Sequence, residues 1–300
     1  MTKNNVNNSI PKPEANLSFE TATGKIRYNL LNDYLFRIVM QKNPEALKQI
    51  ISAILKIPIE TITDLEITNS IIPGEAINNK EFRMDITVKF RNTTSIDIEL
   101  QVNNEYNWKT RGLVYLCRQY DNLIKRGGDY DNNLAAYQIS LLDFTLFDDN
   151  VEFLARYEMI DIKTKYKYNS NFALFVVDLS RIDLATEDDK KSGLDTWSRL
   201  FKATTWEELK SLAKENEIME AVANDVFTCE SDEAIQKRLE DREDYLRHER
   251  FVKERMATLT AENEVLTSEL NNLTSDYINL TSEVERLRAL LKKHNISDET

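Results

Sequence analysis

The sequence predicts an α/β fold, and three observations support this prediction. Two amphipathic helices open the patterned part of the chain, an alternating pair of strands follows them, and a further helix precedes a strand that is apolar on both faces. Helices and strands that alternate in this way are typical of a sheet covered by helices. With 300 residues, of which 41% are hydrophobic and 30% charged, the chain can bury a sizeable core.

The first elements are predicted by apolar spacing. The two helices cover Leu31–Met40 and Pro44–Leu55, and proline suits the first turn of the second helix because it has no N–H to donate there. A short strand at 65–72 ends at a Pro-Gly pair, which indicates a turn. Residues 1–24 are rich in Asn, Ser, Pro and Lys and predict a flexible N-terminal arm.

The next two segments, 82–90 and 96–102, alternate between apolar and polar residues and predict a β-hairpin with one apolar face. Asp85, Glu99 and Gln101 all belong to its polar face. Facing residues of an antiparallel pair share a face, so a three-residue loop sets Asp85 opposite Glu99 and a five-residue loop sets it opposite Gln101. In either register the two carboxylates come close enough to share one cation.

Two carboxylates at that spacing repel each other unless a cation lies between them. The sequence therefore predicts a site for Mg²⁺ (or Mn²⁺), with Asp85, Glu99 and the backbone carbonyl of Leu100 as ligands. Such an ion activates water for attack on a phosphoryl group. Gln101 has no basic group, so its amide would orient the water or hold a phosphate oxygen. The alternative is a solvated polar sheet face without a catalytic role.

Composition excludes several other chemistries. The two histidines, His248 and His294, both lie in the last fifth of the chain, so neither a zincin motif nor a Cys/His zinc cluster can be assembled. The six glycines form neither a Walker loop nor a dinucleotide-binding motif. We expect Cys117 and Cys229 to be buried and reduced. The chain has neither a long apolar window nor the apolar segment of a signal peptide, so we expect a cytoplasmic protein.

Downstream of the hairpin, the sequence predicts a helix at 104–126, ended by a Gly-Gly pair, and apolar strands at 134–142 and 172–179. From residue 197 to residue 244 the pattern is helical and polar. We expect four regions: the N-terminal arm (1–24), a core (25–180), a helical extension (181–250) and a coiled coil (251–294).

The C-terminal region carries the clearest periodicity. Leucine recurs at every seventh residue and fills the d positions of a heptad repeat, at Leu259, Leu266, Leu273, Leu280 and Leu287. Asn263 lies at an a position, which favours a parallel dimer in register. A homodimer is the first interpretation. A trimer, an antiparallel pair and a single amphipathic helix packed on its own domain are the alternatives.

The net charge of −12, from 39 basic and 51 acidic residues, is unusual for a protein that binds nucleic acid. However, residues 206–300 hold 13 basic and 23 acidic residues, whereas residues 1–180 hold 21 and 23. The acidity therefore belongs to the C-terminal part of the chain and says little about the partners of the rest.

The ordered motifs resemble those of the PD-(D/E)xK nuclease superfamily in its D…E-x-Q variant. More closely, they resemble the bacterial recombination-promoting nuclease and transposase family over about residues 28–250. The stretches that carry the resemblance are Asn32–Arg37, Met84–Ile86, Ile98–Gln101, Arg111 with Tyr115 and Tyr120, Gly127 with Tyr130, and Tyr137–Phe144.

This resemblance implies a restriction-endonuclease-like core, in which helices flank a central mixed sheet. It implies a metal-dependent DNA endonuclease linked to recombination or transposition. Asp85 and Glu99 would be its metal ligands, and Gln101 would stand where the parent motif has lysine. Asp33 would add an acidic group to the site, with capping of the first helix as its alternative role. The alternative function is an inactive nuclease fold that acts as a coiled-coil interaction module.

For a nuclease of this kind, the helix that follows the hairpin is expected to contact DNA. Arg111, Tyr115 and Arg118 recur at helical spacing and form a polar stripe on one face of the helix. The two guanidinium groups could reach phosphates, and a solvated helix face is the alternative. We expect Trp108 and Tyr106, by contrast, to serve in packing.

Overall fold

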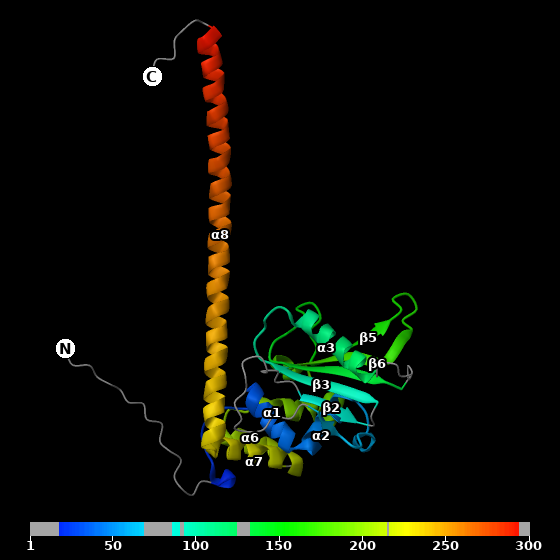
Figure 1. Cartoon of the computed structure of the whole chain (residues 1–300). Coiled ribbons are helices and arrows are strands. Elements are labelled where there is room, and N and C mark those ends of the chain that lie inside the picture. The colour runs from blue at the N-terminus through cyan, green and yellow to red at the C-terminus, as the bar shows by residue number, and fades with distance from the viewer. Residues whose placement is uncertain (1–17, 69–85, 91–92, 125–132, 215, 294–300) are drawn as a thin grey trace, which may run out of the picture. The chain divides into compact units, whose positions relative to one another are not determined.

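The computed structural model describes residues 18–68, 86–90, 93–124, 133–214 and 216–293. The chain divides into two compact units, Met1–Glu240 and Asp241–Thr300. In the described part of the first unit, six strands form one mixed sheet in the order β1-β2-β3-β4-β6-β5 (Figure 1). The strands are β1 (Glu66–Ile67), β2 (Ile86–Phe90), β3 (Thr94–Gln101), β4 (Ala135–Leu142), β5 (Leu154–Ile160) and β6 (Lys167–Asp178).

The helices surround this sheet and continue beyond it. The α-helices are α1 (Asp33–Lys42), α2 (Pro44–Leu55), α3 (Trp108–Leu123), α4 (Glu187–Lys191), α5 (Leu194–Lys202), α6 (Trp206–Ala213), α7 (Glu217–Ser231) and α8 (Glu233–Lys293). Three short 3₁₀ helices are η1 (Phe19–Thr21), η2 (Ile59–Thr61) and η3 (Leu179–Leu184). Helices flank a mixed sheet, and the prediction of an α/β fold is thus confirmed.

The hairpin has one of the two registers that its pattern allows. β2 and β3 pair antiparallel, with Ile86 opposite Ile98 and Phe90 opposite Thr94. Three residues separate Phe90 from Thr94, so this is the register of the three-residue loop. β3 then pairs in parallel with β4, and β4 with β6. Parallel neighbours need a crossover connection, and α3 lies in the connection from β3 to β4.

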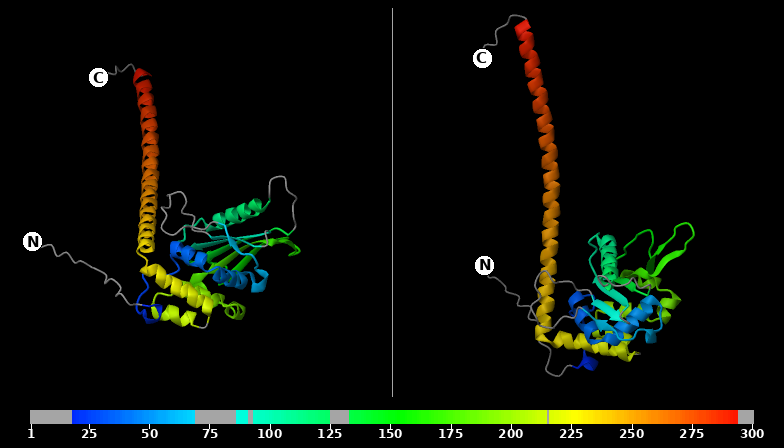
Figure 2. Two further views of the ribbon diagram at one scale, coloured as in Figure 1. Left: turned by 60° about the horizontal axis from the view of Figure 1, so that its bottom comes forward. Right: turned by 45° about the vertical axis from the view of Figure 1, so that its right-hand side comes forward.

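The two faces of the sheet pack against different layers (Figures 1 and 2). The face that carries Ile98, Ile139 and Phe175 joins α1, α2 and α5–α7 in the main hydrophobic core. α3 covers the opposite face, where Trp108 clusters with Leu142, Ala155 and Val176. Trp108 is 3% exposed, so its expected packing role is confirmed. Strands that are buried on both sides explain why β4 is apolar on both faces.

The packed part of the chain begins before residue 25, where the sequence places the end of a flexible arm. Phe19 is 8% exposed, and its ring contacts Trp206 and Phe227 at centroid distances of 6.4 Å and 6.3 Å. The backbone of Lys25 also forms a β-bridge with Thr205. Residues 18–24 are therefore held in place because an aromatic side chain among them is buried by the helices near the end of the first unit.

Four details of the sequence prediction are wrong. The helix after the hairpin begins at Trp108 rather than at residue 104, because Tyr106 has a positive φ of 59° and its N–H donates to the Asn104 side chain at 2.9 Å. Tyr106 does not serve in packing, since it is 90% exposed. Cys117 is exposed on α3, whereas Cys229 is buried as expected. Finally, β5 was not foreseen, although it pairs with β6 along the edge of the sheet.

The described part of the second unit, residues 241–293, is a continuous helix that belongs to α8. Its heptad side chains are exposed along their whole length, from Leu259 at 39% to Leu273 at 70% and Leu287 at 48%. Among the residues that the structure describes, no helix is both long and apolar enough to cross a membrane.

Candidate active site

A layer of buried polar side chains lies on the face of the sheet that α3 covers. β3 alternates, so Ile96, Ile98 and Leu100 enter the main core while the residues between them turn toward α3. Two of these are acidic: Asp97 is 1% exposed and Glu99 is 8% exposed. Burial of carboxylates is costly unless charges or hydrogen bonds compensate them, so their contacts decide what this layer can do.

Arg111 of α3 compensates Glu99. Its Nη2 lies 2.5 Å from Oε1 of Glu99, and its Nη1 lies 3.6 Å from Oε2 of Glu105. Nη2 also donates to the Tyr115 hydroxyl at 3.3 Å. The guanidinium carbon lies 5.0 Å from the Trp108 ring centroid and 5.6 Å from that of Tyr115. Arg111 is thus held between two rings and directed at the carboxylate of β3.

The pKa of Arg111 reports the same balance. Burial by itself lowers the pKa of the guanidinium, but the negative charge of Glu99 and the Tyr115 hydroxyl outweigh this and raise the pKa above its ordinary value. Glu105 acts in the same direction. Arg111 therefore remains fully charged, and the site already contains one positive charge beside Glu99.

The neighbouring strand adds polar groups that the sequence analysis did not select. In the parallel register, Gln138 lies beside Asp97 and Ser140 lies beside Glu99. Both are fully buried, and neither the Gln138 amide nor the Ser140 hydroxyl makes a hydrogen bond to a described residue. Asp97 differs from them, because it accepts a hydrogen bond of 3.2 Å from the Thr87 hydroxyl. Polar residues at alternate positions of an otherwise apolar strand are the sequence signal that could have found Gln138 and Ser140.

The structure places the predicted site residues as follows. Asp85 lies outside the described residues, directly before the first residue of β2. Gln101 ends β3, and its side-chain amide donates to the backbone carbonyl of Asn103 at 3.0 Å. Leu100 pairs with Leu141 and directs its side chain into the main core. Leu100 and Gln101 therefore lie together at one end of β3.

The remaining predicted residues lie on helices. Asp33 is the first residue of α1, but the helix is capped by Asn32, whose side chain accepts from the N–H of Leu35 at 3.0 Å. Tyr115 contacts Arg111 and belongs to the polar layer. Arg118 is exposed on α3. The polar stripe of α3 is therefore divided, because Arg111 faces the sheet while Arg118 faces solvent.

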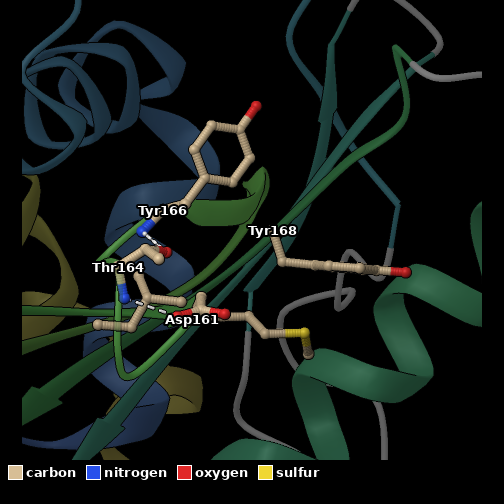
Figure 3. Close-up of a pocket in the computed structure, with 6 residues that line it drawn as sticks. Asp161, Thr164, Tyr166 and Tyr168 are labelled. Carbon is tan, nitrogen blue, oxygen red and sulfur yellow. Dashed lines mark hydrogen bonds between the residues drawn. The ribbon is translucent and has the colours of Figure 1, made fainter.

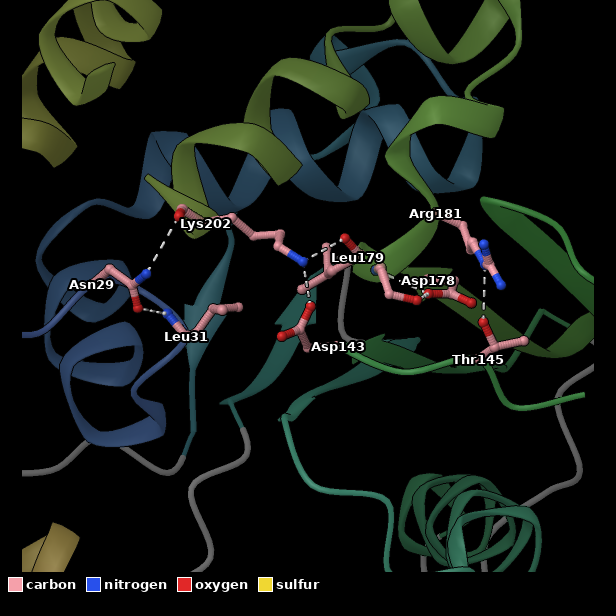
Figure 4. Close-up of polar contacts among 9 residues, drawn as sticks. Asn29, Leu31, Asp143, Thr145, Asp178, Leu179, Arg181 and Lys202 are labelled. Carbon is pink, nitrogen blue, oxygen red and sulfur yellow. Dashed lines mark hydrogen bonds and ion pairs between the residues drawn. The ribbon is translucent and has the colours of Figure 1, made fainter. Parts of the chain in front are cut away.

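Next to Gln101, the carboxyl ends of the parallel strands carry a second set of polar contacts (Figure 4). The N–H of Asp143 donates to the Gln101 carbonyl at 3.0 Å. Lys202 of α5 reaches the Asp143 carboxylate at 2.6 Å and the Leu179 carbonyl at 3.1 Å. This lysine comes from the helical layer opposite α3 and ties α5 to the sheet. It therefore does not supply the lysine that is missing from position 101.

Oxygen donors dominate the polar layer, which suits a hard cation better than a soft one. Among the described residues, no group of three or more His, Cys, Asp or Glu side chains is arranged to hold a metal ion. Asp85, which lies outside the described residues, is the further carboxylate that the sequence provides for a site built on Glu99.

Comparison with known proteins gives one match. A family model described as PD-(D/E)XK nuclease family transposase matches residues 30–255, which is more than half of the chain and includes the sheet, α3 and the polar layer. No curated protein and no solved structure matches significantly. The family match agrees with the mixed sheet flanked by helices and with the D…E-x-Q order of the motifs. The chain belongs to the PD-(D/E)XK nuclease family transposases.

Proposed function

We propose that this protein is a metal-dependent DNA endonuclease linked to transposition or recombination, with Asp85 and Glu99 as ligands of Mg²⁺ (or Mn²⁺). The single observation that carries the proposal is the register of the hairpin. The described pairs end with Ile86 opposite Ile98, and the same register, extended by one residue, would set Asp85 opposite Glu99. Facing residues have Cβ atoms about 4.5–5.5 Å apart, which is close enough for two carboxylates to share an ion.

The chemistry of the described donors fits such an ion. Glu99 is buried beside a guanidinium, so its surroundings already accommodate a positive charge. The hydroxyl of Ser140 lies on the adjacent strand and is not engaged by another described residue. Carboxylate and hydroxyl oxygens are ligands that Mg²⁺ accepts together with water. When bound, the ion would lower the pKa of its water and polarise the phosphoryl group.

The residues around Glu99 would position the substrate. Gln101 ends the same strand, and its amide would exchange the Asn103 carbonyl for the attacking water or a phosphate oxygen. Arg111 would pass from Glu99 to a phosphate when a cation neutralises the carboxylate, because guanidinium binds both groups in the same geometry. Leu100 would contribute its backbone carbonyl, and Asp33 a further acidic group. Tyr115 and Arg118 would contact the phosphates that flank the scissile bond.

The proposed enzyme acts as a homodimer through the heptad repeat of α8. The exposed leucine stripe supports this, because a long helix is stabilised in water mainly by packing of its apolar face. A dimer would bring two nuclease units together, and two centres suit cleavage of both strands of a duplex.

Relaxation of supercoiled plasmid tests the activity. With Mg²⁺ or Mn²⁺, we expect wild type to nick the plasmid and EDTA to stop the reaction. Asp85→Ala and Glu99→Ala should each slow nicking about a hundredfold or more, since loss of a metal ligand removes several kcal/mol of transition-state stabilisation. Asp121→Ala is the matched control, because it removes one exposed carboxylate of α3.

The possible results of the plasmid assay distinguish an active nuclease from an inactive nuclease fold. Equal nicking by wild type, Asp85→Ala and Glu99→Ala would place the activity elsewhere or identify a contaminant. A plasmid that stays intact with wild type and either metal would favour the other candidate function, an inactive nuclease fold that acts through its coiled coil. The observation in favour of that second candidate is the same exposed heptad stripe.

A further inference from the structure

The connection between β5 and β6 forms a tip, residues 159–168, with an unusual surface. Its tyrosines, Tyr166 and Tyr168, are 77% and 81% exposed, and Ile162 is 85% exposed. Three lysines alternate with them along the chain at Lys163, Lys165 and Lys167. Large aromatic side chains are usually buried, so a pair of exposed rings among lysines indicates an interaction surface.

The tip is built to keep these side chains in place. Asp161 accepts hydrogen bonds from the backbone N–H groups of Lys163 at 2.9 Å and Thr164 at 2.7 Å. Its own N–H and C=O also bond across the turn, to Tyr166 and Lys165, each at 2.8 Å. The tip is therefore closed by four bonds to a single residue, which reduces the conformational entropy that binding would cost.

The hairpin of β5 and β6 is anchored beside α3. At its base, Tyr157 packs on the cluster of Trp108, and its ring lies 5.8 Å from that of Phe147. Register shifts on either side of Met159 interrupt the pairing, and such irregularities bend a hairpin. This hairpin extends on the side of the sheet that α3 covers (Figure 1 and the right view of Figure 2). It thus flanks the face of the sheet that carries Glu99, toward which Arg111 of α3 is directed.

Charge at the tip is positive although the whole chain carries −12. Lys167 pairs with Glu158 at 2.6 Å, but Lys163 and Lys165 have no ion-pair partner among the described residues. Hydrogen bonds from the backbone and side chain of Thr164 and from the backbone of Lys163 hold the pKa of Asp161 below its ordinary value. Its charge is directed into the turn, so the two lysines remain available to an anion.

We propose that this tip binds a single-stranded stretch of DNA, an inference that rests on the proposed function and adds a substrate contact to it. Tyr166 and Tyr168 stack on unpaired bases, and Lys163 and Lys165 bind phosphates. The tip residues line an open pocket of about 450 Å³, from which the two rings extend in different directions (Figure 3). Aromatic platforms beside positive charge are the usual means of holding unpaired nucleotides.

Fluorescence anisotropy with the full chain tests this contact. Labelled single-stranded and duplex oligonucleotides of one sequence are titrated in EDTA, so that binding is measured without cleavage. We expect Tyr166→Ser/Tyr168→Ser to weaken single-strand binding about tenfold or more and duplex binding less. Tyr166→Phe/Tyr168→Phe should bind like wild type, because stacking needs the rings. Lys163→Gln/Lys165→Gln should weaken binding to both oligonucleotides. It should also lower the slope of log K against log salt concentration by about one to two, since each phosphate contact on a single strand contributes about 0.7 to that slope.

Lys191→Gln/Lys214→Gln is the matched control, since it removes two exposed lysines from α4 and the end of α6. Unchanged affinity in the serine and glutamine variants would overturn the inference and leave the tip as a contact for protein. Equal losses in the phenylalanine and serine variants would overturn stacking. If wild type nicks plasmid while the tip variants bind normally, the nuclease proposal stands alone. If the tip variants lose DNA but wild type never cleaves, the binding inference stands alone.

Discussion

At the residue scale, Glu99 shows how a neighbouring positive charge compensates a buried carboxylate. A buried carboxylate without compensation would cost several kcal/mol or become protonated. Arg111 supplies the compensation, and α3, which carries it, is packed through Trp108 and Gly112. If Glu99 binds a divalent cation as proposed, Arg111 and that cation would compete for one carboxylate.

This competition makes a prediction about metal binding rather than activity. Replacement of Arg111 by Gln should tighten Mn²⁺ binding about five- to tenfold, because one positive charge near the ion is removed, which is worth about 1 kcal/mol in a solvated site. Titration calorimetry of the full chain measures this, with Arg118→Gln as a control that removes an exposed charge from the same helix. Unchanged or weaker binding in the Arg111 variant would show that the arginine organises Glu99 instead.

A second buried carboxylate, Asp189, has a structural role. Its side chain is 4% exposed, lies 2.7 Å from Lys56 and accepts from the N–H and hydroxyl of Thr186 at 2.9 Å and 2.7 Å. Burial raises the pKa of Asp189, but Lys56 and Thr186 together lower it below the ordinary value. The unfolded chain therefore binds a proton more readily, so this stabilisation is present above the ordinary pKa of aspartate and is lost as pH falls through the lowered folded-state pKa.

We therefore expect Asp189→Asn to reduce the free energy of unfolding at pH 7 by about 1–3 kcal/mol, the usual range for lost charged hydrogen bonds and a cap. The difference in unfolding free energy between the variant and wild type should shrink as pH falls from the ordinary pKa of aspartate through the lowered pKa of Asp189 in the folded state. Urea unfolding at several pH values measures both effects. The exposed neighbour Asp188→Asn should change stability by only a few tenths of a kcal/mol. A deficit that stayed constant with pH would contradict the role assigned to the charge.

At the scale of elements, the sequence predicts what alternation and caps determine. α2 runs from Pro44 to Leu55 as predicted, and the β2–β3 pair has one of the two registers that the alternation allowed. The sequence analysis did not predict β5, because this strand lies at the edge of the sheet. Arg156 is exposed there and Tyr157 is only partly buried, so the alternation of apolar and polar residues is weak. Such strands are defined by the partner strand, and a single sequence does not show the partner.

The candidate site divides in the same way. Alternation alone sets Glu99 and Gln101 on the polar face of the hairpin. It does not show that α3 covers this face and buries Glu99, or that Gln138 and Ser140 lie beside the acids. These facts depend on the parallel pairing of β3 with β4, which joins residues about forty positions apart. For this reason the sequence assigned Arg111 and Arg118 to one stripe that contacts DNA, whereas in the structure Arg111 faces the sheet and Arg118 is exposed.

At the scale of the whole molecule, the chain combines a nuclease unit with a helix whose apolar stripe has the spacing of a coiled coil. α8 continues to Lys293, and its d-position leucines are between 39% and 70% exposed. Ion pairs such as Arg286 with Glu283, at 2.8 Å, contribute little to the stability of an exposed helix. A second copy of the helix is the partner that the heptad spacing fits best, because the same stripe then covers itself.

Measurement of the solution mass tests this last proposal. Light scattering should give wild type twice the chain mass of 35.0 kDa. Leu266→Lys/Leu273→Lys places charges in the stripe and should give 35.0 kDa, since buried unpaired lysines would cost more than the pairing supplies. Ser268→Lys/Ser275→Lys adds the same charges at f positions, which face away from the seam, and should keep the wild-type mass. A wild-type mass of 35.0 kDa would contradict dimerisation, and a threefold mass would establish the trimer.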